Sequence, residues 1–164
     1  MLWTTREQEL EVYRFLDGLT AHLRQSRDLR NALLFTLRET REFLDADRAA
    51  VAILPPGAAI AEVTLAHPSD GAWDLALLSQ FIRHEHPRLP HDLLLAPLRR
   101  RARVWGVLAL RRDRAPFEKG TGRVLVRIAA GLSEAIERID RDRMLEVRDR
   151  IDRKIMEQLR PKDL

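Results

Sequence analysis

The stretch "LLLAPLRRRARVWGVLALRR", Leu93 to Arg112, carries the pattern that decides the fold. Two apolar segments, Asp92–Leu98 and Arg103–Leu110, flank a short polar turn rich in arginine. Runs of this length on either side of a short turn are typical of a β-hairpin. We therefore expect two adjacent antiparallel strands here.

The second of these strands is apolar on both of its faces. Strict alternation would turn one set of side chains to one face (Val104, Gly106, Leu108, Leu110) and the other set to the opposite face (Trp105, Val107, Ala109). Because both sets are apolar, we expect a layer of structure on each side of the sheet. Gly106, inside the strand, indicates a bulge or a close approach of another backbone.

The segments before this hairpin complete the predicted architecture. Two more strands, Asp47–Leu54 and Ala61–His67, are joined by the turn signal "PPG". Helical spacing marks Val12–Leu23, a second helix that ends near Leu44 with Ser26 as a plausible N-cap, a third over Trp73–His86, and a long helix that opens near Pro116 and Phe117. The order predicts an α+β fold with a central antiparallel sheet, terminal helices on one face and a short covering helix on the other.

Two apolar stripes at heptad-like spacing lie in the terminal helices. The N-terminal stripe is formed by Val12, Leu16, Leu19 and Leu23, and the C-terminal stripe by Met144, Val147, Ile151, Ile155 and Leu159. A narrow stripe with charged flanks is typical of a coiled coil. One domain cannot easily bury both stripes, so we predict a parallel homodimer. The alternative is an amphipathic helix that folds back on its own domain beyond Met144.

Composition limits the possible classes of protein. The chain has 164 residues, 45 % of them hydrophobic and 33 % charged, and no cysteine. The lack of cysteine excludes disulfides, thiolate metal sites and cysteine nucleophiles. No apolar run reaches the roughly 20 residues that span a bilayer, and the N-terminus does not resemble a signal peptide. We expect a cytoplasmic protein that does not bind membranes.

The net charge of +4 has a local source. The segment from Arg99 to Arg114 holds seven arginines and one aspartate. Such a segment could hold phosphates, and a nucleic-acid-binding regulator is therefore one alternative function. Neither an aromatic platform nor a groove-reading helix accompanies the arginines, so a nucleic-acid partner is not the preferred interpretation.

The chain resembles a GAF domain from Asp28 to Ile139. The resemblance rests on "LRNALLFTLRETREFLDADRAAVAIL", "LLLAPLRRRARVWGVLALRR" and "FEKGTGRVLVRIAAGLSEAIERI". It implies first and last helices that pack on one sheet face and often dimerise. It also implies a small-ligand pocket on the other face, and a long helix that passes a signal to an output domain.

Some ligands of GAF domains do not fit this chain. The sequence "EKGTG" after Phe117 lacks the signature that often marks cyclic-nucleotide binders of the family. The missing cysteine argues against covalent bilin attachment and excludes methionine sulfoxide reductase chemistry. No cofactor is evident, and an unknown small ligand is compatible with the sequence.

Three of the five histidines lie in "HEHPRLPH", His84 to His91, at the rim of the expected pocket. Their spacing matches no strong metal signature, so we predict no metal site and interpret them mainly as a solvated helix end. Contact with a ligand at the pocket rim is the alternative. The candidate ligand-binding residues are Trp73, Phe81, His84, His86, His91 and Trp105. The aromatic members could equally be plain core.

These observations predict three parts: an N-terminal dimerisation helix (1–25), a GAF-like domain (26–140) and a C-terminal signalling-helix linker that continues toward an output domain (141–164). We expect a regulatory sensor or signal-relay module of a bacterial signalling protein. A serine–histidine–acid set, a P-loop and paired carboxylates are all missing from the sequence, so this segment is not expected to be an enzyme. The alternative is a structural dimerisation module with a vestigial pocket.

Overall fold

The computed structural model describes residues 5–159, which form four helices and four strands. The helices are α1 (Thr5–Gln25), α2 (Leu29–Phe43), α3 (Leu75–Ile82) and α4 (Thr121–Leu159), and the strands are β1 (Arg48–Ile53), β2 (Glu62–His67), β3 (Leu93–Arg100) and β4 (Arg103–Arg111). The strands form one antiparallel sheet in the order β2-β1-β4-β3. The predicted α+β class is confirmed.

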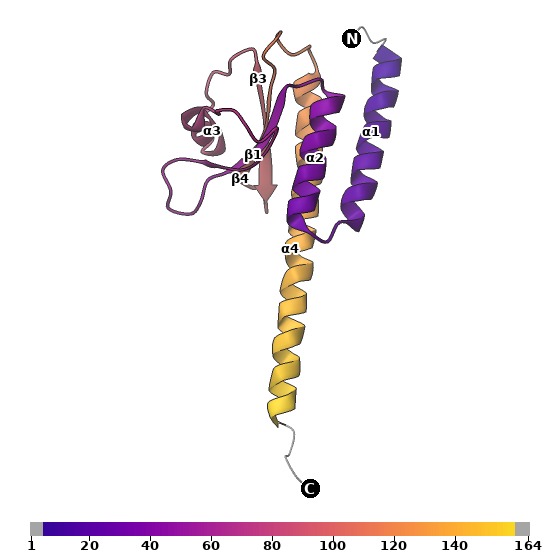
Figure 1. Ribbon diagram of the computed structural model, residues 1–164, viewed down its shortest axis with the longest axis vertical. Helices are drawn as coiled ribbons and strands as arrows, with labels where there is room; N and C mark the ends of the chain where they lie inside the picture. The colour runs from indigo at the N-terminus through magenta and orange to yellow at the C-terminus, as the bar shows by residue number, and fades with distance from the viewer. Residues whose placement is uncertain (1–4, 160–164) are drawn as a thin grey trace.

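Helices cover both faces of this sheet. Helices α1, α2 and the first half of α4 lie on one side, and the short α3 lies on the other (Figure 1). The second half of α4 projects away from the sheet (Figure 1). None of the helices within residues 5–159 combines the length and the apolar character that a membrane crossing requires.

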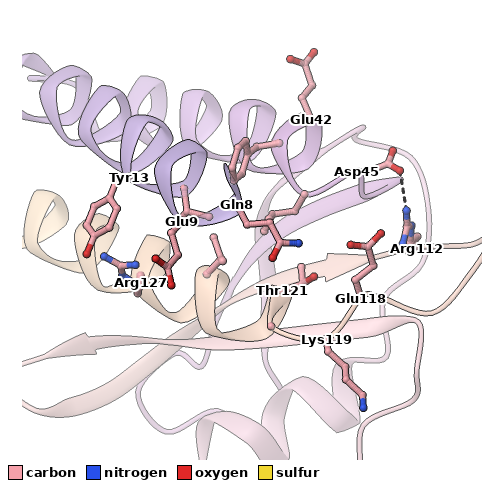
Figure 2. A pocket seen from close by; sticks show the side chains of 15 residues that line it. Gln8, Glu9, Tyr13, Glu42, Asp45, Arg112, Glu118, Lys119, Thr121 and Arg127 are labelled. Atoms are coloured by element: carbon pink, nitrogen blue, oxygen red, sulfur yellow. Dashed lines mark hydrogen bonds and ion pairs between the residues drawn. The ribbon is translucent and has the colours of Figure 1, made fainter. Parts of the chain in front are cut away.

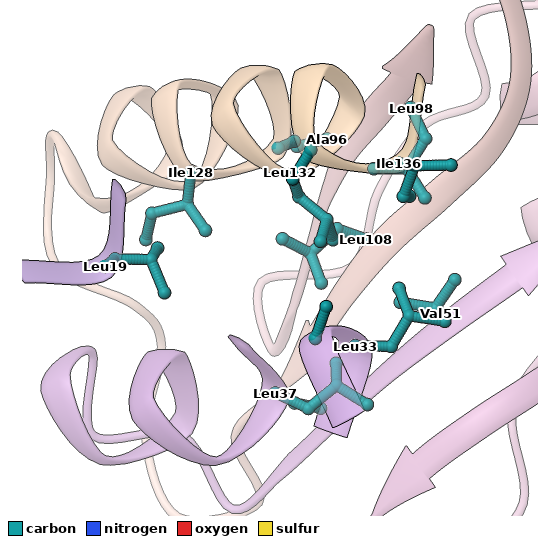
Figure 3. Close-up of a cluster of buried hydrophobic side chains, with 14 of the residues drawn as sticks. Leu19, Leu33, Leu37, Val51, Ala96, Leu98, Leu108, Ile128, Leu132 and Ile136 are labelled. Carbon is teal, nitrogen blue, oxygen red and sulfur yellow. The ribbon is translucent and has the colours of Figure 1, made fainter. Parts of the chain in front are cut away.

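The larger core lies between the three long helices and the sheet (Figure 3). Leu37 of α2, Leu108 of β4 and Leu132 of α4 are among its fully buried side chains. Helix α4 contributes one stripe of apolar residues to it at steps of three and four: Leu125, Ile128, Leu132, Ile136 and Ile139. This stripe ends at Ile139, and the residues of α4 from 141 onward are exposed.

Strand β4 contains the bulge that Gly106 indicated. Leu98 pairs with Gly106 but the next residue, Arg99, pairs with Val104, so Trp105 is an extra residue on β4. The bulge reverses the alternation expected from the sequence. Val104 therefore packs with the α3 side of the sheet, and Trp105 packs against the larger core on the opposite side.

Three predicted helix ends were wrong. The side chain of Asp28, not Ser26, caps α2 by accepting a hydrogen bond from Arg30 N (3.0 Å), and Ser26 Oγ donates to His22 O (3.1 Å).

Helix α3 is only eight residues long and does not reach His86 as predicted. The backbone leaves the helical conformation after Ile82, and His84 and His86 have left-handed φ angles of 60° and 48°. Helix α4 begins at Thr121 rather than near Phe117, since Gly120 before it has φ +89°.

The two predicted dimer stripes differ in burial. In the N-terminal stripe, Leu19 and Leu23 are buried inside this single chain, and Val12 and Leu16 are half-buried. The domain therefore buries most of that stripe itself, which corrects the expectation that one chain could not. The C-terminal stripe is exposed at every position (Met144, Val147, Ile151, Ile155, Leu159). We call these five residues the tail stripe.

We predict that Gly106→Ala lowers the free energy of unfolding by about 1–3 kcal/mol, measured by urea unfolding. A Cβ atom at Gly106 would lie 2.8 Å from the backbone oxygen of Ala52 on the neighbouring strand. The matched control is Gly131→Ala in α4, where a Cβ meets no other atom within 4 Å. That change should raise stability by about 0.5–1 kcal/mol through helix propensity. A Gly106→Ala variant as stable as the parent would contradict the described contact between β4 and β1.

Candidate functional site

The face of the sheet under α3 is the candidate ligand site. Leu78 and Ile82 of α3 are buried against the sheet, and Trp73 and Phe81 are half-buried beside them. The sheet contributes Ala52, Val107 and Ala109, which are small or medium-sized side chains. This second core is thinner than the first because one short helix covers it.

Ser79 fixes α3 over the sheet. Its hydroxyl donates to Leu75 O (2.6 Å) and accepts from Ala61 N (2.7 Å), just before β2 begins. The side chain is 2 % exposed, so both hydrogen bonds are shielded from water. Removing the hydroxyl would leave the buried N–H of Ala61 without this partner.

The indole N–H of Trp73 is a buried hydrogen-bond donor without an acceptor among the described residues, and it lies on the α3 side of the sheet. Buried polar groups in folded proteins almost always have a partner, either in the protein or in an ordered water molecule, and a polar atom of a ligand can take the same place. Trp73 directly precedes the cap residue of α3, Asp74, whose side chain accepts from Leu77 N (3.1 Å).

The histidines of "HEHPRLPH" lie in the loop after α3. His84, His86 and His91 are all exposed. Within residues 5–159, His, Cys, Asp and Glu side chains are nowhere grouped in threes close enough to hold a metal ion. The loop carries these histidines at the edge of the α3 face rather than inside it.

The structure therefore brings together only some of the residues that were predicted to bind a ligand. Trp73 and Phe81 pack against the core under α3, but Trp105 packs on the opposite face of the sheet. The bulge in β4 causes this separation. Since Trp105 belongs to the core under the long helices, it cannot contact a molecule held between α3 and the sheet.

Two arginines anchor the loop that leads into Trp73. Arg48 of β1 donates to Asp70 O, and its guanidinium lies against Gly71 so closely that a side chain there would collide with it. Arg111 of β4 donates to Ala72 O (2.7 Å). The backbone of residues 70–72 is thus tied to the two central strands, and the position of Trp73 follows from them.

The arginines between Arg99 and Arg114 do not form one surface. They divide between the β3–β4 turn and the far end of β4, which the strand length separates by roughly 25 Å. Several bind carboxylates of the same chain: Arg100 with Asp140, Arg112 with Asp45 and Arg114 with Asp47. This arrangement is typical of structural ion pairs and does not favour the nucleic-acid alternative.

A groove on the helical side was not predicted from the sequence. It has a volume of about 590 Å³ and lies between the first half of α1, the end of α2 and the start of α4 (Figure 2). Val12, Phe43 and Val124 contribute apolar surface, and charged side chains of both signs surround them (Glu9, Glu42, Asp45, Arg112, Lys119, Arg127). Arg112 is paired with Asp45, and the Arg127 guanidinium lies over the Tyr13 ring at 5.3 Å.

The fold described here, a four-stranded antiparallel sheet between three long helices and one short helix, defines the class of α+β single-sheet domains. The chain belongs to the GAF domain family, whose model matches residues 28–136. The predicted family is confirmed. A search of curated proteins finds no match.

Solved GAF domains share the fold at low sequence identity. One from the phosphoenolpyruvate-protein phosphotransferase (ptsP) of Coxiella burnetii is 15 % identical with a TM-score of 0.65, over 81 % of this chain and 96 % of that one. GAF-B of DevS from Mycobacterium smegmatis is 20 % identical with a TM-score of 0.59 (72 % and 99 % covered). The GAF domain of a protein described as a sensor histidine kinase from Pseudomonas syringae pv. tomato is 18 % identical with a TM-score of 0.61 (87 % and 94 % covered).

Two titratable groups have shifted pKa values near the ends of β1 and β2. The hydrogen bond from Asp113 N (2.5 Å) holds the pKa of Asp47 below its ordinary value of 3.8, and Arg114 and Arg112 add to this. Burial lowers the pKa of His67, and the nearby guanidiniums of Arg41 and Arg38 lower it further. Asp47 is thus charged, and its charge stabilises the junction between β4 and the segment that leads to α4.

We predict that Asp47→Asn lowers the free energy of unfolding at pH 7 by roughly 1 kcal/mol, because the amide can still accept from Asp113 N but loses the charge that strengthens this bond. Because the folded-state pKa is lowered, this stabilisation is present above the unfolded value of 3.8 and is lost as pH falls through the folded value. Urea unfolding of both proteins between pH 7 and pH 3 measures the difference. Asp152→Asn, on the exposed part of α4, is the control. A difference that is independent of pH would show that the charge is not involved.

Proposed function

We propose that this chain is a regulatory GAF module of a larger signalling protein, which passes a signal through α4 to an output domain. Family membership supports this proposal, and so does the description of a structural neighbour as a sensor histidine kinase. The cytoplasmic location and the bacterial origin expected from the sequence belong to the same proposal.

The observation that carries the proposal is the projecting half of α4. Residues 141–159 are helical and exposed throughout, a length of about 28 Å at the ordinary rise of a helix. In proteins, most of the stability of a helix comes from packing of its apolar face. Ile151 and Ile155 are about half exposed, at 53 % and 47 %. A helix with such an apolar face calls for a partner.

A second copy of this chain is the partner that we propose. The tail stripe advances by steps of three, four, four and four residues, a mean of about 3.75 that is near the 3.5-residue spacing of parallel helix pairs. Acidic and basic residues alternate on its flanks, as in Glu146–Arg150 and Asp149–Arg153, and such pairs support an exposed helix. Two tail stripes packed together would remove ten apolar side chains from water.

The α3 face is the proposed place for a small ligand. Its supporting observation is the buried Nε1–H of Trp73, which has no acceptor in the described part of the chain. A ligand oxygen or nitrogen near Trp73 and Phe81 would satisfy it, with His84, His86 and His91 at the outer edge. Arg111 links the Trp73 loop to β4, so a ligand there would act on a central strand.

The alternative is a dimerisation module without a ligand. The core under α3 supports it, since the chain itself buries Leu78, Val107 and Ala109 almost completely. In that case, α3 would be a permanent cover, and the chain would only relay a change that reaches it through α1.

We predict a mass of about twice 19.0 kDa by light scattering at micromolar concentration, because the tail stripes pair. Ile151→Asp with Ile155→Asp should yield monomers, since each carboxylate would enter an apolar contact. The matched control is Met156→Asp, which puts the same charge on an exposed apolar residue beside the stripe. A monomeric parent would refute the dimer, and a control that dissociates equally would refute the assignment of the stripe.

We predict that native mass spectrometry finds a small organic molecule on protein purified without added ligand. Trp73→Phe should lose it because the donor is gone, and Trp105→Phe should keep it because Trp105 lies on the other face. A ligand-free parent, together with a Trp73→Phe variant stabilised by about 1 kcal/mol through removal of the unpaired donor, would favour the dimerisation module.

A further inference from the structure

Two turns from distant parts of the chain contact α4 where it leaves the domain. One is the β3–β4 turn, and the other is the turn between α1 and α2. Both bind the segment Ser133–Asp140, directly before the exposed half of the helix.

The β3–β4 turn binds one side of this segment. Arg99 N donates to Ser133 Oγ (3.0 Å) and Arg101 N donates to Glu137 Oε1 (3.1 Å). The Arg100 guanidinium lies 3.4 Å from the Asp140 carboxylate. The three residues of α4 are spaced by four and three, so they form one line along the helix.

The conformation of this turn depends on α4. Arg101 and Ala102 both have left-handed φ angles, 51° and 65°. Hairpin turns of this type usually have asparagine and glycine at these positions, because other side chains are strained there. The N–H of Arg101, one of these strained residues, donates the hydrogen bond to Glu137. This bond stabilises the turn conformation and also holds α4 against the turn.

Arg138 leaves the segment on an adjacent face and binds the end of α1 and the turn that follows it. Its guanidinium donates to the carbonyl oxygens of Leu23, Arg24 (2.5 Å) and Ser26 (3.1 Å). The last carbonyl groups of a helix have no N–H partner within the helix. The guanidinium of Arg138 in α4 therefore caps the C-terminal end of α1. The flat guanidinium fork can serve several carbonyls at once, which a lysine cannot do.

We infer that these contacts form an exit collar that fixes the rotation of α4 about its own axis, with Glu137 and Arg138 as its positioning residues. The two residues are adjacent, so their side chains leave the helix about 100° apart. Contacts in two directions prevent rotation, which a contact in one direction would allow. Beyond Asp140, the side chains of α4 are exposed as far as Leu159, where the described residues end.

The collar also sets the direction of the tail stripe. The line Ser133, Glu137, Asp140 continues as Met144, Val147 and Ile151 at alternating steps of four and three. The residues held by the β3–β4 turn and the tail stripe therefore lie on the same side of one continuous helix. A movement of either turn would rotate the stripe, and this last step rests on the proposed relay function.

Hydrogen–deuterium exchange of the purified chain tests the collar without reference to dimerisation. Arg138→Met should speed exchange in the last turn of α1 at least tenfold, with Arg138→Lys in between. Arg141→Met, which removes the same charge one turn later, should change nothing there. Likewise, Glu137→Ala should speed exchange in the β3–β4 turn, and Glu134→Ala should not. Unchanged exchange at both turns would overturn the collar.

Cysteine crosslinking tests the direction of the stripe, and the chain has no cysteine of its own. Ile151→Cys should crosslink two copies at least fivefold faster than Arg153→Cys, which points to the opposite side of the helix. If Ile151→Cys fails to crosslink in the parent, the proposed dimer is refuted, and the exchange experiment still decides the collar.

Discussion

Strand β4 is buried on both of its faces, and the architecture follows from that constraint. Between Val104 and Leu110 only the bulged Trp105 is appreciably exposed. A central strand of this kind needs apolar cover on each side of the sheet. The two covers are unequal: three long helices lie on one side, and the eight residues of α3 lie on the other. The thicker cover includes α4, and the thinner cover is the single short helix α3, which is where we propose the ligand site.

The sheet could be predicted from the sequence because its strands are short apolar runs separated by clear turn signals. The face on which Trp105 lies could not be predicted. A bulge moves every later side chain by one position, and only a difference in polarity between the two faces would reveal it. Here both faces are apolar, so Trp105 and Val107 fit either assignment equally well. Gly106 marked the place of the bulge but not which neighbour was extra.

The presence of the helices could be predicted from the sequence. Their exact ends, and the surfaces against which they pack, could not. Ser26 and Asp28 are both good N-caps, and the choice between them depends on the path of the preceding turn. The stripes of α1 and α4 both advance by steps of three and four residues, yet Leu19 is buried in its own domain and Ile151 is not. Spacing shows that a face is apolar and says nothing about what covers it. The helical groove depends on the angle between α1 and α4, for which the sequence offers no signal.

One row of side chains along α4 changes from polar to apolar at the edge of the domain. Within the domain it presents Ser133, Glu137 and Asp140, which bind the backbone and an arginine of the β3–β4 turn. Beyond the domain the same line presents Met144 and Val147, which could not satisfy those polar groups. The polar half thus suits a turn with free N–H groups, and the apolar half suits another helix. Because the backbone hydrogen bonds of α4 run through both halves without a break, the contact made by the first half determines which way the second half faces.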